Sequence, residues 1–310
     1  MRAERIKELD IAKGICILLM VIGHSGMPDA LHRFIYAFHM PFFFFVSGIT
    51  TNVSKSLFPY LQNKIKGLLV PFLIYDLIHF PSYALIYNRS AIEQFISEFN
   101  EGSFGSALWF VPILFMAHII NWLVPRKKIV EFVAILVLSS ISSILCIEKI
   151  ILPYNLSVLG LGASFVVMGR LLSLEGVNQM YMKFNDISKY LLIIIASMIV
   201  TWWISLHYSL NVGFCLIEPC LPIMVGALSG ILMILFLSRV CFLKCRMISL
   251  FLSYSGANTF VFLGFSQFIL KFENLYIRDL VALKYLLLFA ALYTIIWLKN
   301  QIPMAKALKL

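Results

Sequence analysis

Two histidines and a lysine near the start of the chain could do acid–base chemistry in surroundings that exclude water. His24 and His39 lie in or beside apolar runs, and Lys13 precedes His24 in the same run. Imidazole titrates near neutral pH, so it can take a proton from a hydroxyl group and return it later in a reaction. A lysine supplies a point charge that suits phosphate. These residue types make the three positions candidates for a functional site that moves protons.

Helical spacing places these side chains on common faces. Lys13 and His24 are eleven residues apart, which returns an α-helix to within about 20° of the same face and raises it by about 16 Å. Asp10 lies on the same stripe. On the next apolar run, Tyr36 and His39 share a face through the i, i+3 relation. We expect His24 and His39 to lie at a similar depth and to face a shared polar cavity.

The second apolar run also contains a proline and four consecutive phenylalanines. Pro41 leaves the carbonyl of Ala37 without its helical partner, so it should bend a helix there. Phe42 to Phe45 are expected to face lipid and neighbouring helices, while His39 points at the polar cavity. A lone buried histidine often serves only as a structural donor, but two at matching depth favour a functional site.

The composition predicts an all-α integral membrane protein. The chain has 310 residues, of which 61% are hydrophobic and 13% charged, and its mean hydropathy is +0.92. A soluble domain needs more polar surface, and a helical span needs about 20 apolar residues. We predict a single transmembrane domain over 1–310, with a short outer interfacial segment at about 88–106. The apolar stretches predict about ten helices, at 11–27, 34–50, 67–87, 106–124, 129–147, 150–172, 190–206, 216–238, 248–270 and 280–298.

The distribution of basic residues predicts the orientation. Most of the 25 Lys and Arg residues fall on one side, including the cluster at 126–128, and that side is cytoplasmic by the positive-inside rule. Both termini are then cytoplasmic. The net charge of +10 is explained by this orientation and by anionic lipid, without nucleic acid. The six cysteines show no metal-binding spacing, so we predict free thiols and no metal.

Other ionisable groups inside predicted spans have weaker signals. Asp76 and His79 form an i, i+3 pair that either neutralises itself or offers Asp76 to a substrate. His118 and Asn121 are expected to contribute to packing. Glu218 lies at the outer boundary, where its side chain should reach toward the lipid headgroups.

Several segments together resemble the membrane acyltransferase family three, close to its fucose 4-O-acetylase-like branch. The segments are RIKELDIAKGICILLMVIGH, FIYAFHMPFFFFVSG and KIKGLLVPF, with LWFVPILF, FVVMGRLL and GANTFVFLGFSQ later in the chain. The resemblance implies a multi-pass enzyme of the bacterial cytoplasmic (inner) membrane. Such an enzyme moves an acyl group, usually acetyl from acetyl-CoA, to a hydroxyl of a cell-envelope or lipid-linked saccharide. Two positions depart from the family pattern, because Ser266 stands where a histidine is frequent and Gly67 replaces an arginine.

The resemblance also implies roles for particular residues. Lys13 and His24 match the family's pair of a basic residue ahead of a histidine, and His24 is the expected general base. A homo-oligomer is left open. The expected site residues are His24 and His39 for catalysis, Lys13, Lys64, Lys66 and Asp10 for the coenzyme, and Tyr36, Trp109 and Asp76 for the acceptor.

Two other functions fit the same residues. A transporter or flippase for a lipid-linked saccharide or a small solute would explain many helices and buried polar groups without chemistry. The chain has no internal repeat, which is common in transporters, and its polar residues concentrate in the first three predicted helices. A membrane domain that only senses or binds a small molecule is the third alternative. Transfer of labelled acetyl from acetyl-CoA to a glycan would favour the enzyme.

Overall fold

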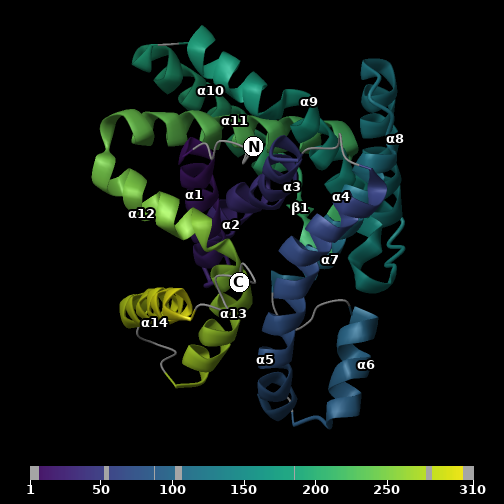
Figure 1. Ribbon diagram of the computed structural model, residues 1–310, viewed down its shortest axis with the longest axis vertical. Helices are drawn as coiled ribbons and strands as arrows, with labels where there is room; N and C mark the ends of the chain where they lie inside the picture. Colours follow the sequence, from purple (N-terminus) through teal and green to yellow (C-terminus); the bar gives the residue numbers. More distant parts are fainter. Residues whose placement is uncertain are drawn as a thin grey trace. The chain divides into compact units, whose positions relative to one another are not determined.

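The computed structural model describes residues 7–51, 56–86, 88–101, 107–184, 186–276 and 281–302, most of which are helical (Figure 1). Leu210 pairs with Ile217 in a two-stranded antiparallel hairpin. The elements are α1 (Lys7–Gly23), α2 (Asp29–Tyr36), α3 (His39–Ile49), α4 (Leu57–Lys64), the π-helical turn η1 (Ile65–Leu69), α5 (Val70–Ile86), α6 (Ala91–Glu101), η2 (Ala107–Trp109), α7 (Phe110–Leu123), α8 (Lys128–Ile147), η3 (Pro153–Val158), α9 (Leu159–Lys183), α10 (Ile187–His207), β1 (Leu210–Asn211), η4 (Val212–Phe214), β2 (Leu216–Ile217), α11 (Cys220–Lys244), α12 (Arg246–Ala257), α13 (Thr259–Tyr276) and α14 (Val281–Gln301).

Within the described residues, five helices are long and apolar enough to cross a membrane. They are α8, the continuous segment of η3 and α9, α10, α11 and the part of α14 from Leu283, and a sixth arises if α12 and α13 form one broken span. The prediction of an all-α membrane protein is therefore confirmed. Ten spans and cytoplasmic termini stay predictions. Helices such as α1 and α7 are shorter than a full span, and residues 1–6 and 303–310 lie outside the described ranges.

The predicted bend at the second apolar run is confirmed. α2 ends at Tyr36 and α3 begins at His39, just ahead of Pro41. Proline has no N–H for the carbonyl four residues earlier, so the helix breaks there. Phe42 to Phe45 were expected to face lipid and neighbouring helices; the contact with neighbouring helices is confirmed, and the exposure to lipid was wrong, because all four are at most 9% exposed. They pack inside the protein because α3 contacts α1, α9 and α11 on several sides.

The fold divides into two compact units. The first comprises residues 1–54, 116–151 and 157–257, and the second comprises 55–115, 152–156 and 258–310. The first unit therefore contains α1 to α3, α8 to α12 and the hairpin. The second contains α4 to α6, α13 and α14, and Figure 1 shows α6 turned back beside α5.

In the first unit, glycines let α1 approach α12 at backbone distance. A Cβ at Gly14 would overlap the carbonyl group of Leu252, and one at Gly256 would overlap the carbonyl oxygen of Asp10. Small residues allow such close crossings between membrane helices. This crossing fixes the helix that carries Lys13 and leads to His24.

A second pair of glycines fixes the helix that carries His39. A Cβ at Gly48 of α3 would overlap the carbonyl oxygen of Val166 in α9, and one at Gly169 of α9 would overlap that of Phe45 in α3. Each of the two histidine-bearing elements is thus held by close backbone packing against a neighbouring helix, α1 against α12 and α3 against α9.

We expect Gly169→Ala to lower the stability of the protein by about 1–3 kcal/mol, because the added methyl group meets backbone that cannot rotate away. Gly67→Ala is the matched control, since nothing lies within 4 Å of a Cβ at that position. Thermal unfolding of the two variants in the same detergent measures the difference. Equal melting temperatures for Gly169→Ala and Gly67→Ala would contradict the proposed backbone contact.

The second unit has an aromatic core and a capped helix. Tyr75 of α5 lies 6.3 Å from Phe260 and 5.5 Å from Phe265 between ring centroids. At the start of α6, the Ser90 N–H donates to Glu93 Oε2 (2.8 Å) and the Glu93 N–H donates to Ser90 Oγ (3.2 Å), which is a capping box. The bonds to Ser90 hold the pKa of the Glu93 carboxyl below its ordinary value. α6 coincides with the predicted outer segment, of which 102–106 lie outside the described ranges.

Candidate functional site

Tyr36 joins the two predicted catalytic histidines in the first unit. Its hydroxyl lies 2.7 Å from His24 Nδ1 and 3.4 Å from His24 Nε2. Its ring meets His39 edge to face at 4.6 Å between centroids and stacks on His32 at 3.9 Å. The end of α1, α2 and the start of α3 therefore bring His24, Tyr36 and His39 together, which we call the histidine–tyrosine cluster.

The two histidines of this cluster have different surroundings. His39 is 1% exposed, and its Nδ1 lies 2.9 Å from the carbonyl oxygen of Ile35. A carbonyl only accepts, so Nδ1 donates, and in the neutral ring Nε2 keeps the lone pair. His24 is exposed, at the residue after α1. A base at His24 Nε2 requires the Nδ1–H to donate to the Tyr36 oxygen. The exposed ring can reach a substrate, whereas the buried ring can orient its neighbour.

Lys13, predicted to bind the coenzyme, is paired with another predicted residue. Its Nζ lies 2.6 Å from Asp10 Oδ1, with the lysine side chain 27% exposed and the aspartate 5%. Asp10 thus neutralises the lysine in this structure, and a phosphate would meet a paired cation. The i, i+3 spacing on one helix brings the two groups within contact. The attraction of Lys13 for an anion is therefore weaker than the sequence alone indicates.

The other two predicted coenzyme residues belong to the second unit. Lys64 ends α4, and its Nζ lies 5.7 Å from the centre of the Tyr60 ring, a cation–π distance. Lys66 is exposed in the π-helical turn η1. Single π-helical turns occur frequently at functional sites. A joint basic cluster of Lys13, Lys64 and Lys66 stays a prediction.

The predicted acceptor residues Trp109 and Asp76 also belong to the second unit. Trp109 ends η2 with its ring edge-on to Phe110 at 6.4 Å, and Asp76 is half-buried on α5. The side chain of His79, the proposed neutralising partner of Asp76, lies outside the described part of the chain. Ser266, where the resembling family often has histidine, is fully buried on α13. Its Oγ has no hydrogen-bond partner among the described residues.

A second buried polar group in the first unit lies between α3 and α7. Ser47 Oγ is 2.6 Å from His118 Nε2. Both His118 and Asn121 are 0% exposed, and the side-chain amide of Asn121 has no hydrogen-bond partner among the described residues. The sequence predicted only packing for these two residues, and the hydrogen bond to Ser47 was missed because the partners are 71 positions apart.

Arg170 organises the helix ends beside this polar group. Its Nη1 donates to the carbonyl oxygens of Asn121 (2.5 Å) and Val124 (3.3 Å), and its Nη2 donates to Glu131 Oε1 (2.7 Å). One guanidinium thereby connects the end of α7, the first turn of α8 and α9. The sequence feature that could have indicated this ion pair is the acidic residue Glu131, which comes shortly after a basic cluster at the start of an apolar run.

A polar network supports α2 at the opposite end of the first unit. Arg33 Nη2 donates to Ser209 Oγ at 2.9 Å, and the Ser209 N–H donates to Glu218 Oε2 at 3.0 Å. Ser143 Oγ donates to the Glu218 carbonyl oxygen at 2.9 Å. The expected reach of Glu218 toward headgroups stays a prediction, and in the structure its carboxylate accepts the Ser209 N–H and joins the two ends of the hairpin.

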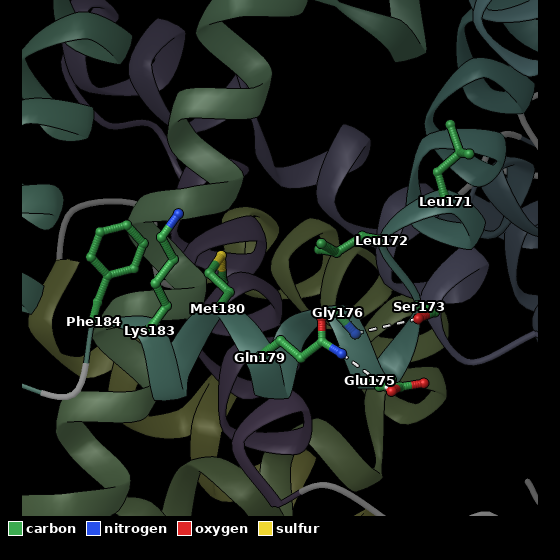
Figure 2. A pocket seen from close by; sticks show the side chains of 9 residues that line it. All are labelled: Leu171, Leu172, Ser173, Glu175, Gly176, Gln179, Met180, Lys183 and Phe184. Atoms are coloured by element: carbon green, nitrogen blue, oxygen red, sulfur yellow. Dashed lines mark hydrogen bonds between the residues drawn. The ribbon is translucent and has the colours of Figure 1, made fainter. Parts of the chain in front are cut away.

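Figure 2 shows a pocket along the last part of α9. Its volume is about 590 Å³ and its lining includes Ser173, Glu175 and Lys183. Ser173 has φ 56° and ψ 170°, so it interrupts the helix, and its Oγ accepts the Gly176 N–H at 3.3 Å as a cap of the following turn. None of the sequence-predicted site residues lines this pocket.

A metal site of three or more His, Cys, Asp or Glu side chains is not found within the part of the chain that the structure describes. One protein family matches the chain. Its description is "Acyltransferase domain", and the match covers residues 6–300. Neither the comparison with curated proteins nor that with solved structures gives a match.

Proposed function

We propose that this chain, which belongs to the acyltransferase domain family, transfers acetyl from acetyl-CoA to a hydroxyl of a cell-envelope saccharide. Family membership makes it an acyltransferase, and its apolar helices make it a multi-pass membrane protein. The resemblance of its first 75 residues supports the acetyl donor, the saccharide acceptor, a place near the fucose 4-O-acetylase-like branch and the bacterial inner membrane. The observation that carries the proposal is the hydrogen bond between Tyr36 and an exposed His24, with His39 beside them.

The proposed chemical step uses His24 as the general base. The acceptor hydroxyl attacks the carbonyl carbon of the thioester while His24 Nε2 takes its proton. The bond from carbon to sulfur then breaks, and the coenzyme thiolate receives the proton from the imidazolium. Tyr36, held at 2.7 Å from His24 Nδ1, orients the ring in the tautomer that this step requires. His39, fixed by Ile35, supports Tyr36 from the other side.

The donor would approach from the side that carries the basic residues. Lys13 and His24 are separated by about 16 Å along α1, which is comparable to an extended pantetheine arm. In this proposal the phosphates lie near Lys13, the basic residue of the first unit on the helix that leads to His24, and the thioester reaches the histidine–tyrosine cluster. Trp109 and Asp76 are proposed to contact the acceptor. Acceptor-dependent release of coenzyme A by the purified protein tests the proposal.

Lys13→Ala should raise the apparent KM for acetyl-CoA by about tenfold and leave kcat nearly unchanged. A hydrogen bond from a charged group contributes about 1.5–3 kcal/mol. Because Lys13 is already paired with Asp10, we expect its bond to the donor to contribute an amount at the lower end of this range. Loss of binding shared by ground and transition states raises KM alone. Initial rates against donor concentration measure both constants.

Two further variants test the role of Lys13. Asp10→Asn should lower the KM for acetyl-CoA, because it releases the lysine from its ion pair. Lys128→Ala removes an exposed lysine at the start of α8 and should change neither constant. A lower kcat with unchanged donor affinity in Lys13→Ala would place this lysine elsewhere in the mechanism.

A further inference from the structure

Two cysteines that are distant in the sequence meet at one end of the first unit. Cys146 lies in the last turn of α8, and Cys215 lies between η4 and β2. Their side chains interact with each other. Both are buried, at 8% and 6% exposure, and both are thiols in the structure.

The packing of the hairpin on α8 accounts for this meeting. α8 contacts β2, and Ser143 donates to the Glu218 carbonyl oxygen at 2.9 Å. Cys146 follows Ser143 by three residues, so it lies on the same helix face, one turn closer to the end. Cys215 has φ 51° and ψ 33°, a left-handed conformation that shapes the loop ahead of β2. The contact therefore belongs to an ordered set of interactions between α8 and the hairpin.

The charges at the helix ends place both cysteines outside the cytoplasm. α8, α10 and α11 are candidate spans. α8 begins next to Arg126 and Lys127, α10 begins close to Lys189, and α11 ends at Lys244. By the positive-inside rule these ends are cytoplasmic. The end of α8 and the hairpin between α10 and α11 then face the outer compartment, where disulfides form and persist.

We propose that Cys146 and Cys215 form a disulfide that secures the hairpin to α8. A thiolate of one cysteine attacks the disulfide of an extracytoplasmic thiol oxidoreductase and forms a mixed disulfide. The second thiolate then attacks this mixed disulfide and breaks it, so that the two cysteines are oxidised, and the oxidoreductase takes up their two electrons and two protons and leaves as a dithiol. Because the cysteines are buried in the folded unit, the bond forms as the hairpin closes onto α8.

The disulfide would also support the helix that carries Tyr36 of the histidine–tyrosine cluster. The same hairpin holds α2 through the hydrogen bond from Arg33 to Ser209 and the contacts of α2 with β1. α2 ends at Tyr36. A hairpin fixed to α8 therefore stabilises the position of the tyrosine that contacts His24.

Thiol counting on the full-length protein tests the disulfide. Membranes from cells with an intact export and oxidation pathway are denatured in N-ethylmaleimide, reduced, and labelled with a polyethylene-glycol maleimide. Wild type should gain two labels, which appear as two steps on a gel. Cys146→Ser and Cys215→Ser should each gain none. Cys241→Ser, at the cytoplasmic end of α11, should gain two like the wild type.

A measurement of thermal stability tests the disulfide in a second way that does not depend on the labelling of single variants. Reductant should lower the melting temperature of the purified wild type by several degrees and leave that of the Cys146→Ser/Cys215→Ser double variant unchanged. Wild-type protein without labels after reduction would overturn the proposal. Labels that persist in Cys146→Ser, or equal effects of reductant on both proteins, would also overturn it.

Discussion

His24→Ala should lower the turnover of acyl transfer by about 10²–10⁴-fold, the usual effect of removing a general base. That loss corresponds to about 3–5 kcal/mol of transition-state stabilisation. The side chain is exposed at the end of α1, so its truncation should leave the fold intact. Turnover is measured as coenzyme A release in the presence of acceptor, and binding of coenzyme A is measured separately by calorimetry.

Two histidine variants give this prediction its controls. His39→Gln keeps a donor for the Ile35 carbonyl oxygen and should retain measurable activity with a weaker dependence on acceptor. His207→Ala removes an exposed histidine at the end of α10 and should have normal turnover. If His39→Gln is inactive while His24→Ala is active, the two roles are reversed. Normal turnover in both would show that the histidine–tyrosine cluster is not the active site.

Glu131→Gln should lower the free energy of unfolding by about 3–5 kcal/mol, because it leaves the Arg170 guanidinium without its carboxylate. The pair is 2.7 Å apart, and each side chain is 8% exposed. Arg170 also binds the carbonyl oxygens at the end of α7, so its displacement disturbs three helices at once. A loss of this size is a large fraction of the stability of a typical domain. Thermal and denaturant unfolding in detergent measure it.

A double variant separates the ion pair from the packing of its side chains. Glu131→Met with Arg170→Met should recover much of the lost stability, since apolar side chains of similar volume often replace a buried pair without penalty. Glu175→Gln, an exposed carboxylate on α9, should unfold like the wild type. Wild-type stability in Glu131→Gln would mean that the ion pair does not hold these helices together.

Local features of the fold could be predicted from sequence because they depend on nearby residues. Hydropathy predicted the helices that became α8, α10 and α11. Pro41 predicted the break between α2 and α3, since a missing N–H acts four residues away. Helical spacing predicted that Tyr36 and His39 would share a face, and the structure adds that Tyr36 contacts both histidines.

Features that depend on tertiary packing could not be predicted in this way. The sequence pattern of an apolar run such as Phe42 to Phe45 is the same whether the run faces lipid or protein. Only the contacts of α3 show that this run faces protein. The bonds from Ser47 to His118 and from Arg170 to Glu131 join positions 71 and 39 apart. The ion pair between Lys13 and Asp10 could have been predicted, because the i, i+3 spacing of the two residues is visible in the sequence.

Transfer of radiolabelled acetyl from acetyl-CoA to an extracted envelope saccharide, catalysed by purified protein in lipid nanodiscs, tests the proposed function most directly. We predict that label appears on the saccharide, that one coenzyme A is released for each acetyl transferred, and that His24→Ala abolishes both. The contradicting result is a folded protein that binds the saccharide or moves it across a vesicle membrane and leaves acetyl-CoA intact.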